Sequence, residues 1–246
     1  MVEPMFSKAM NGEIQIGSLI QLDGPEAKHA ISVRRMRVGE DIQLSNGTGL
    51  RVRGEIMGIR SNVVEIQVTE SLQETNPEVM VTLVQALAKG DRDELAIQAA
   101  TELGVYSVIP WEADRSISKW IGLKEEKAVA RWQTIVTEAA KQSLRSFTPI
   151  VKPAVATMGL AHLVSEFDSV LILDPTAEQG LGSLEFSQPQ SLAIVVGPEG
   201  GISPQELEQL ESAGAKRVRL GQSILRTSTA GVAAIAAIMS KTNLWR

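Results

Sequence analysis

Two glycine turns, each placed directly after an apolar segment, constrain the fold of this chain most strongly. Residues 192–196 read Leu-Ala-Ile-Val-Val and run into Gly197-Pro-Glu-Gly-Gly201. Residues 218–220 run into Gly221, and Ile224-Leu-Arg-Thr227 follows. Each turn opens onto a stretch with helical character. In an open α/β sheet, turns at the carboxyl ends of strands bind ligands. The last fifty residues therefore predict two walls of one pocket.

Neither turn has the spacing of a common nucleotide-binding loop. No Gly-Lys-Ser/Thr follows the first turn, so it is not a P-loop, and the glycines do not match Gly-x-Gly-x-x-Gly. Two ordinary strand-to-helix turns account for the spacing equally well, because glycine commonly marks turns. Spacing alone leaves both interpretations open.

Upstream of these turns, strand-like and helical segments alternate from Val79 onward. This rhythm predicts an α/β domain with a mainly parallel sheet. We expect strands at 79–87, 106–110, 150–151, 170–173, 192–196 and 218–220, and helices at 92–103, 125–144, 158–164, 204–212 and from about 226. In the first helix, Asp91 is the expected cap, and the apolar face is predicted to carry Leu95, Ala96, Ala99 and Leu103. The apolar, alanine-rich last helix is expected to be buried on most sides.

Residues 1–72 have a different character, with short strands separated by turns. We expect extended segments at 14–22, 41–44, 50–59 and 63–68, a helical turn at 25–33 and a hairpin at 46–49. Such a pattern indicates a small β-barrel. The polar segment 71–78 contains Pro77 and is the expected linker. The predicted domains are therefore 1–72 and 79–246.

Composition excludes several kinds of site and partner. The 246 residues include no cysteine and only His29 and His162, which argues against disulfides, thiol nucleophiles and Cys- or His-rich metal sites. We expect no metal, and a histidine as isolated as His29 is expected to be structural. No run reaches the length of a membrane span and no signal peptide is seen, so the expected location is cytoplasmic.

The net charge of −5 does not fit a protein that coats nucleic acid at random. Residues 28–53 nevertheless hold six basic residues against two acidic ones. Any RNA contact is therefore expected to be a local patch.

Several motifs together resemble one family. Gly197-Pro-Glu-Gly-Gly201 followed by Leu220-Gly-x-x-Ile-Leu-Arg-Thr-x-Thr-Ala230 is similar to the knotted SPOUT RNA methyltransferases, and within them to the ribosomal RNA small-subunit methyltransferase E family. Residues 89–92, 98–105 and 141–145 also match its characteristic positions. Between His29 and Glu40 the chain resembles the PUA-like RNA-binding domain of that family, with Arg34 in place of the usual Leu. Gln222-Ser223 and Ser228 depart from the usual Pro-Arg and Glu.

The resemblance implies S-adenosylmethionine-dependent methylation of a uridine N3 in the 16S rRNA of the small ribosomal subunit. It also implies a trefoil knot at the chain end and a homodimer. The expected cofactor-binding residues are Leu173, Gly197, Glu199, Gly201, Leu220, Gly221, Ile224, Leu225 and Thr227. Glu199 is a candidate partner for a ribose hydroxyl or the sulfonium, and bracing of the loop is the alternative.

Arg226 is the expected catalytic residue. Uridine N3 holds its proton at neutral pH, so methylation produces negative charge on the uracil. A guanidinium stays protonated and cannot be the base, but it can stabilise that charge. Bracing of the knot loop is the alternative role. Expected RNA contacts are Arg34, Arg35, Arg37, Arg51, Arg53, Lys141 and Arg145, with solvated faces or helix salt bridges as the alternative.

Two other functions compete with this reading. A related knotted methyltransferase would act on another RNA base or on tRNA. A non-catalytic RNA-binding protein would retain the fold without binding S-adenosylmethionine, and the departures at Gln222, Ser223 and Ser228 are the features that favour it.

Overall fold

The computed structural model describes residues 3–186, 190–242 and 245. Within this part of the chain, no helix is both long and apolar enough to cross a membrane. The chain divides into two compact units. The first contains residues 1–76 together with 140–148, and the second contains 77–139 and 149–246. The short segment 140–148 thus belongs with residues far away in sequence, which local sequence patterns did not indicate.

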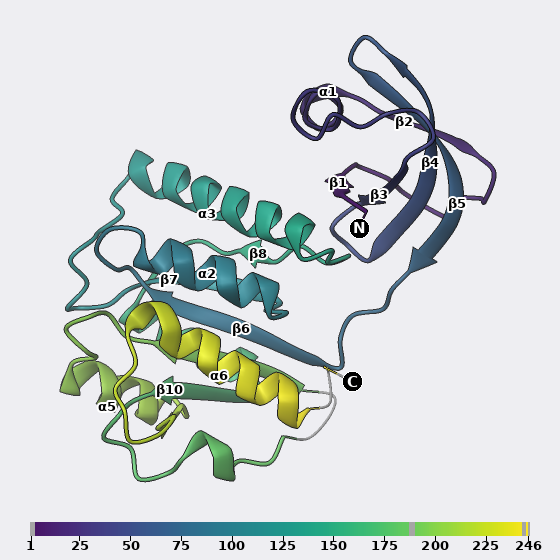
Figure 1. Ribbon diagram of the computed structural model, residues 1–246. Helices are drawn as coiled ribbons and strands as arrows, with labels where there is room; N and C mark the ends of the chain where they lie inside the picture. Colours follow the sequence, from purple (N-terminus) through teal and green to yellow (C-terminus); the bar gives the residue numbers. More distant parts are fainter. Residues whose placement is uncertain (1–2, 187–189, 243–244, 246) are drawn as a thin grey trace. The chain divides into compact units, whose positions relative to one another are not determined.

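The first unit is a five-stranded sheet in the order β1-β3-β4-β5-β2 (Figure 1). Strand β1 pairs with β3 in parallel, and the other pairs are antiparallel. Apolar residues of β4 alternate with polar ones, and Val52 and Ile56 are fully buried in its core. The elements are β1 (Met5–Ser7), β2 (Leu19–Leu22), α1 (Gly24–Lys28), the π-helix η1 (His29–Val33), β3 (Asp41–Ser45), β4 (Leu50–Arg60) and β5 (Val63–Gln73).

Two expectations for this unit were wrong in extent. The segment 14–22 is extended only from Leu19, because Gly17 adopts a φ of +88° and turns the chain just before it. Strand β5 does not end at Val68 but continues to Gln73, where it pairs with Leu50 at the start of β4. The expected linker, 71–78, therefore begins only after Gln73.

The second unit is built on a seven-stranded sheet in which every strand pair is parallel, as predicted. The main path runs β12-β10-β11-β6-β7-β8, and β9 pairs with β7. Its strands are β6 (Val79–Ala86), β7 (Ser107–Glu112), β8 (Ile150–Val151), β9 (Val155–Ala156), β10 (Ser169–Leu173), β11 (Gln190–Val196) and β12 (Lys216–Val218). Its helices are α2 (Arg92–Glu102), α3 (Leu123–Gln142, whose last residues belong to the first unit), α4 (Thr157–Leu163), α5 (Pro204–Ser212), α6 (Thr227–Lys241) and the 3-10 turns η2 (Val164–Glu166) and η3 (Leu181–Ser183).

Helices cover both faces of this sheet. On one face, α2, α3 and α6 pack against residues such as Leu83, Ile194 and Val108 in the larger core (Figure 1). On the other face, α4 and α5 pack against residues such as Ile109 and Val195. The arrangement is a three-layer α/β unit, in which the turns at the carboxyl ends of the strands remain available for a site.

The structure revises the predicted face of α2 and agrees with that of α6. In α2, Ala96 is buried as predicted, but Leu95 is 52% exposed and the buried face also carries Ile97 and Ala100. Asp91 stands at the N-cap of this helix, but its side chain makes no capping hydrogen bond. In the apolar stretch 230–239 of α6, every residue except the exposed Ala237 is buried or half-buried, so the helix is covered on most sides as predicted.

Candidate functional site

A pocket of about 580 Å³ lies where β10 and β11 end and α6 begins. Eight of the predicted site residues line it: Leu173, Gly197, Glu199, Gly201, Ile224, Leu225, Arg226 and Thr227. The lining also includes residues outside the predicted cofactor and catalytic set: Arg92, Asp174, Pro175, Thr176, Val196, Pro198, Ile202, Leu207 and Ala230. The first glycine turn and residues 224–227, which follow the second turn, therefore form walls of one cavity.

Leu220 and Gly221, also predicted for the cofactor, are not among the lining residues. Leu220 packs against the larger hydrophobic core. A Cβ atom at Gly221 would meet nothing within 4 Å, so the protein itself does not require glycine there. The chain reaches the pocket four residues later than expected, at Ile224 rather than at Leu220.

The first glycine turn is held closely by the protein. A Cβ atom at Gly197 would lie 2.6 Å from Cγ1 of Ile202, which is too close for any side chain. Within the turn, Gly201 N–H donates to the carbonyl of Pro198 at 2.9 Å. Arg115 Nη1 donates to the carbonyl of Gly200 at 2.9 Å. The backbone of the turn is thus fixed from inside and from the segment after β7.

Glu199 braces the same turn to the start of α2. Its Oε1 accepts from Arg92 Nη1 at 2.7 Å and from the backbone N–H of Lys89 at 3.1 Å. Partial burial alone raises the pKa of Glu199, but hydrogen bonds from its own amide, Arg92 and Lys89 outweigh that effect, and the pKa lies below its ordinary value. The carboxylate therefore stays ionised while it holds the loop.

Thr227 joins the second turn to the first. Its Oγ1 donates to the carbonyl of Gly197 at 2.9 Å and accepts from Nε2 of Gln85 at 2.9 Å. A hydroxyl has one hydrogen to donate. Since that hydrogen is bonded to Gly197, Thr227 acts as a brace rather than as a donor to a bound ligand.

Asp174 forms a third wall at the end of β10. Its Oδ1 accepts from the N–H and hydroxyl of Thr176, both at 2.8 Å, and its Oδ2 accepts from Arg217 Nε at 2.8 Å. Burial alone raises the pKa of Asp174, but the Thr176 and Arg217 donors outweigh it and lower the pKa overall. This carboxylate is therefore ionised and fixed beside the pocket.

Arg226 lies at the N-cap of α6 with an exposed side chain on the pocket edge. Its backbone carbonyl accepts from the N–H groups of Thr229 and Ala230, both at 2.9 Å. Among the residues described, no carboxylate lies within ion-pairing distance of its guanidinium. Backbone hydrogen bonds therefore fix the position of Arg226 in the chain, and the charge of its guanidinium is not neutralised by a carboxylate of the described residues.

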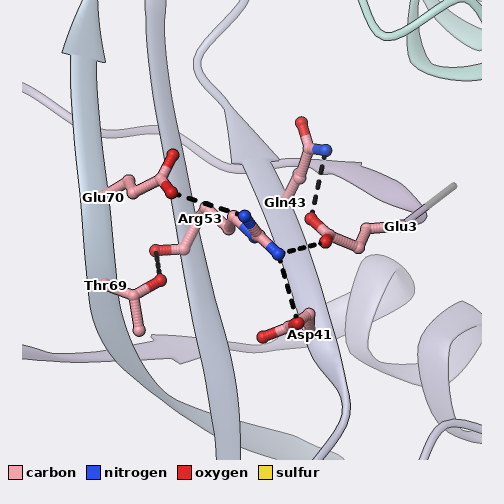
Figure 2. Close-up of polar contacts among 6 residues, drawn as sticks. All are labelled: Glu3, Asp41, Gln43, Arg53, Thr69 and Glu70. Carbon is pink, nitrogen blue, oxygen red and sulfur yellow. Dashed lines mark hydrogen bonds and ion pairs between the residues drawn. The ribbon is translucent and has the colours of Figure 1, made fainter.

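The arginines predicted to contact RNA fall into two groups. On β4, Arg53 is surrounded by the carboxylates of Glu3, Asp41 and Glu70, as Figure 2 shows. The field of Glu3 has the largest effect, and the pKa of Arg53 is raised further above its ordinary value despite some desolvation. Arg51 pairs with Glu74 at 3.5 Å. These two guanidinium groups are already neutralised by the protein.

Arg34, Arg35 and Arg37 form the other group and are exposed. Arg34 donates to the uncharged Gln142 at 3.3 Å, and none of the three pairs with a carboxylate in the part of the chain that the structure describes. Arg35 has a φ of +56°, an uncommon conformation for a residue with a side chain. It follows the π-helix η1, and Met36 beside it is buried. This turn keeps three unneutralised cations on the surface.

Lys141 is buried and ion-paired, which agrees with the salt-bridge alternative, whereas Arg145 is half-buried. Lys141 is only 6% exposed, and its Nζ pairs with Glu26 Oε1 at 2.7 Å. Burial lowers the pKa of Arg145 to about 10, so it remains protonated at neutral pH. Both lie in the segment 140–148 of the first unit, where Lys141 serves to attach that segment to α1.

Several site residues escaped sequence reasoning. Gln85 was read as one more residue of a strand, although a polar residue in an otherwise apolar segment was a usable signal. Asp174 and Thr176 follow a predicted strand, so the rule that placed the glycine turns applied to them too. Arg92 and Arg115 become neighbours of the 197–201 turn only through the tertiary fold.

Comparisons with known proteins cover most of the chain and agree on one family. The family described as an RNA methyltransferase domain matches residues 74–239, and the family described as an RNA methyltransferase PUA domain matches residues 22–68. Ribosomal RNA small subunit methyltransferase E of Mycobacterium tuberculosis is 39% identical, covering 93% of this chain and 89% of its own length. The Bacillus subtilis protein of that name is 32% identical, with 98% and 97% covered.

Solved structures agree as well. The crystal structure of Ribosomal RNA small subunit methyltransferase E from Neisseria gonorrhoeae bound to S-adenosyl methionine superposes with a TM-score of 0.86 at 31% identity, covering 97% of this chain and 98% of that one. A Legionella pneumophila methyltransferase in complex with the same cofactor has a TM-score of 0.85 at 27% identity, with 98% of both chains covered. This chain belongs to the ribosomal RNA small subunit methyltransferase E family.

Proposed function

We propose that this protein transfers a methyl group from S-adenosylmethionine to N3 of a uridine in the 16S rRNA of the small ribosomal subunit. The main support for this proposal is the pocket lined by the 197–201 turn and by residues 224–227, with the unneutralised Arg226 at its edge. Membership of the family supports the rRNA substrate, and cofactor-bound relatives support S-adenosylmethionine.

The pocket residues fit this cofactor. About 580 Å³ is within the range of roughly 300–1,000 Å³ that is usual for small-molecule sites. Leu173, Ile224 and Leu225 offer apolar surface for an adenine ring, and Gly197 and Gly201 leave backbone groups accessible. Glu199 and Asp174 are ionised but already paired with Arg92 and Arg217, so they hold the walls of the pocket in place. When bound, the cofactor supplies an electrophilic methyl group.

Arg226 is the residue to which we assign a role in the methyl-transfer step. For this reaction the N3 proton would pass to solvent, and the bound cofactor would supply the methyl group to N3 and be left as a neutral thioether. Negative charge on the uracil oxygens accompanies the loss of this proton. A guanidinium held at the pocket edge stabilises such charge, whereas it cannot accept the proton.

We further propose that residues 1–72 form a PUA-like RNA-binding barrel and that 79–246 form the methyltransferase domain. Of the predicted RNA contacts, the structure favours Arg34, Arg35 and Arg37, because their charges are not neutralised by the described carboxylates. Arg51, Arg53 and Lys141 instead hold the first unit together through ion pairs.

The trefoil knot and the homodimer are part of the same proposal. Ile224 is 80% exposed and Leu225 is 40% exposed in the single chain. Large apolar side chains at such positions are suited to being covered by a ligand or by a second copy of the chain. A cytoplasmic location is proposed on the strength of the substrate, since ribosomal subunits are assembled there.

A methyl-transfer assay tests the function. The protein is incubated with methyl-labelled S-adenosylmethionine and either small subunits or tRNA, and the RNA is digested to nucleosides. Label in 3-methyluridine from 16S rRNA is expected. Label in another nucleoside, or in tRNA, would instead identify a related knotted methyltransferase. No label, together with no cofactor binding, would indicate a non-catalytic RNA-binding protein.

A further inference from the structure

A buried chain of hydrogen bonds links three segments around the pocket. Gln85, on β6, is fully buried. Its Nε2 donates to the carbonyl of Ala86 at 3.1 Å and to Oγ1 of Thr227 at 2.9 Å. Thr227 Oγ1 then donates to the carbonyl of Gly197 at 2.9 Å. The chain therefore joins β6 to the start of α6 and to the turn after β11.

The direction of every bond in this chain is fixed by its first member. A backbone carbonyl only accepts, so the part of the Gln85 amide next to Ala86 must be its NH₂ group. The same NH₂ group reaches Thr227, whose oxygen therefore accepts. The single hydroxyl hydrogen of Thr227 is then directed to Gly197.

The other end of the Gln85 amide is unusual. Its Oε1 is buried and has no hydrogen-bond partner among the described residues. Leaving a buried polar atom unpaired is unfavourable, and an apolar side chain in this strand would avoid it. The unpaired oxygen is explained if the N–H groups of Gln85 serve a purpose that an apolar side chain cannot.

We propose that Gln85 is a positioning residue for the cofactor pocket. By holding Thr227 as an acceptor, Gln85 directs the Thr227 hydroxyl to Gly197 and so fixes the peptide of the glycine turn. Gln85 is not among the pocket-lining residues, so it acts through Thr227. This inference rests on the proposed function, because S-adenosylmethionine is the ligand whose binding it affects.

The substitution Gln85→Glu tests the direction of the bonds, because it changes the side chain's shape little. An ionised carboxylate only accepts, so it draws the Thr227 hydrogen to itself and leaves Gly197 without its donor. Burial raises the pKa of a carboxyl group introduced there, and its protonated form can donate to Thr227 again. Calorimetric titration with S-adenosylmethionine should show affinity roughly tenfold or more below that of the unaltered protein at about pH 9, with recovery at about pH 6.

Matched variants separate positioning from folding. Gln85→Met has no donor and is expected to bind weakly at both pH values. Thr227→Ser keeps the hydroxyl and should retain most of the binding that Thr227→Val loses. Unfolding temperatures show which variants are folded. If Gln85→Glu is unfolded at the higher pH, the comparison of Thr227→Ser with Thr227→Val decides whether the bond from the Thr227 hydroxyl positions the glycine turn. The unaltered protein, titrated at both pH values, corrects for the other ionisable groups on neighbouring segments, among them Arg92, Asp93, Asp174, Glu199 and Arg226.

The outcomes distinguish this inference from the proposed function. Equal affinity of Gln85→Glu and the unaltered protein at both pH values would overturn the positioning role alone. An absence of cofactor binding by the unaltered protein would overturn the proposed function, and this inference with it. Weak binding by Gln85→Glu that recovers only on acidification would support both.

Discussion

At the scale of single residues, Arg226 is the cation on which the proposed chemistry depends. Its guanidinium lies at the pocket edge without a carboxylate partner among the described residues. We expect Arg226→Ala to lower kcat for methylation of small subunits by about 10²–10³-fold, the effect of removing one donor to a developing anion. Cofactor affinity should change little. Single-turnover methylation and calorimetric titration of the same preparation measure the two quantities.

Arg226→Lys is the matched variant, because it keeps the charge but not the planar group of donors. It is expected to retain more activity than Arg226→Ala. If cofactor affinity fell together with kcat in both variants, Arg226 would be a bracing residue of the pocket wall.

Asp174 gives a pH-dependent prediction. Burial alone raises the pKa of Asp174. Hydrogen bonds from Thr176 and the charge of Arg217 outweigh burial and lower this pKa below the ordinary value of about 3.9. The unfolded chain therefore takes up a proton first as the pH falls. The stability that this network contributes is present above the ordinary pKa and is lost as the pH falls through the lower folded-state pKa.

Arg217→Met should accordingly lower the unfolding temperature at neutral pH, and the difference from the unaltered protein should shrink toward about pH 3. Thermal unfolding over a pH series measures this. Lys216→Met replaces the neighbouring exposed lysine and is the control, which should change the unfolding temperature little. A difference that did not vary with pH would mean that Arg217 acts through packing rather than through the Asp174 charge.

At the scale of elements, the turn after η1 and the strand β4 differ in their available charge. Arg34, Arg35 and Arg37 carry unneutralised charges, whereas Arg53 is surrounded by three carboxylates (Figure 2). Replacing Arg34, Arg35 and Arg37 by Gln should reduce the slope of log K against log salt concentration by about 2–3, because each phosphate contact contributes roughly 0.7–0.9. Binding of 16S rRNA over a salt series measures that slope.

Arg53→Gln is the matched control from the same unit. It should leave the slope nearly unchanged, because the charge that it removes is already balanced by Glu3, Asp41 and Glu70. A larger loss of slope in Arg53→Gln than in the triple variant would place the RNA surface on β4 instead.

The end of α3 is the second element with a specific prediction. Lys141 is 6% exposed and pairs with Glu26 of α1. Lys141→Met leaves that carboxylate without this partner and should lower the free energy of unfolding of the first unit by about 1–3 kcal/mol. Denaturant unfolding measures the loss. Arg51→Met breaks a more exposed pair and should cost less than about 1 kcal/mol, so an equal loss in both variants would contradict a special role for Lys141.

For the whole molecule, sequence reasoning predicted what local patterns determine. Most strands of the parallel sheet followed from apolar segments, and α5 was predicted with its observed bounds, but β9 was not predicted and β12 begins at Lys216 rather than at Val218. The Ser203 side chain and Glu206 form a capping box there, a signal that is local to the helix start. The two glycine turns were placed in one pocket because a general rule relates strand ends to ligand sites.

What could not be predicted depends on segments that meet only after folding. Glu3, Asp41 and Glu70 surround Arg53 from separate parts of the chain, so charge counting over residues 28–53 overestimated the free positive charge. Likewise, nothing local indicates that 140–148 clusters with the first unit rather than with the helix that precedes it. The hydrogen bond from Gln85 joins residues that are 142 positions apart.

Calorimetric titration with S-adenosylmethionine tests whether the 197–201 turn and residues 224–227 enclose a cofactor site. The unaltered protein and Arg226→Ala are expected to bind about one cofactor per chain. Gly197→Val should abolish binding, because its Cβ atom would meet Ile202 at 2.6 Å and displace the turn. Heat of binding in Gly197→Val equal to that of the unaltered protein, or no binding by the unaltered protein, would contradict the account.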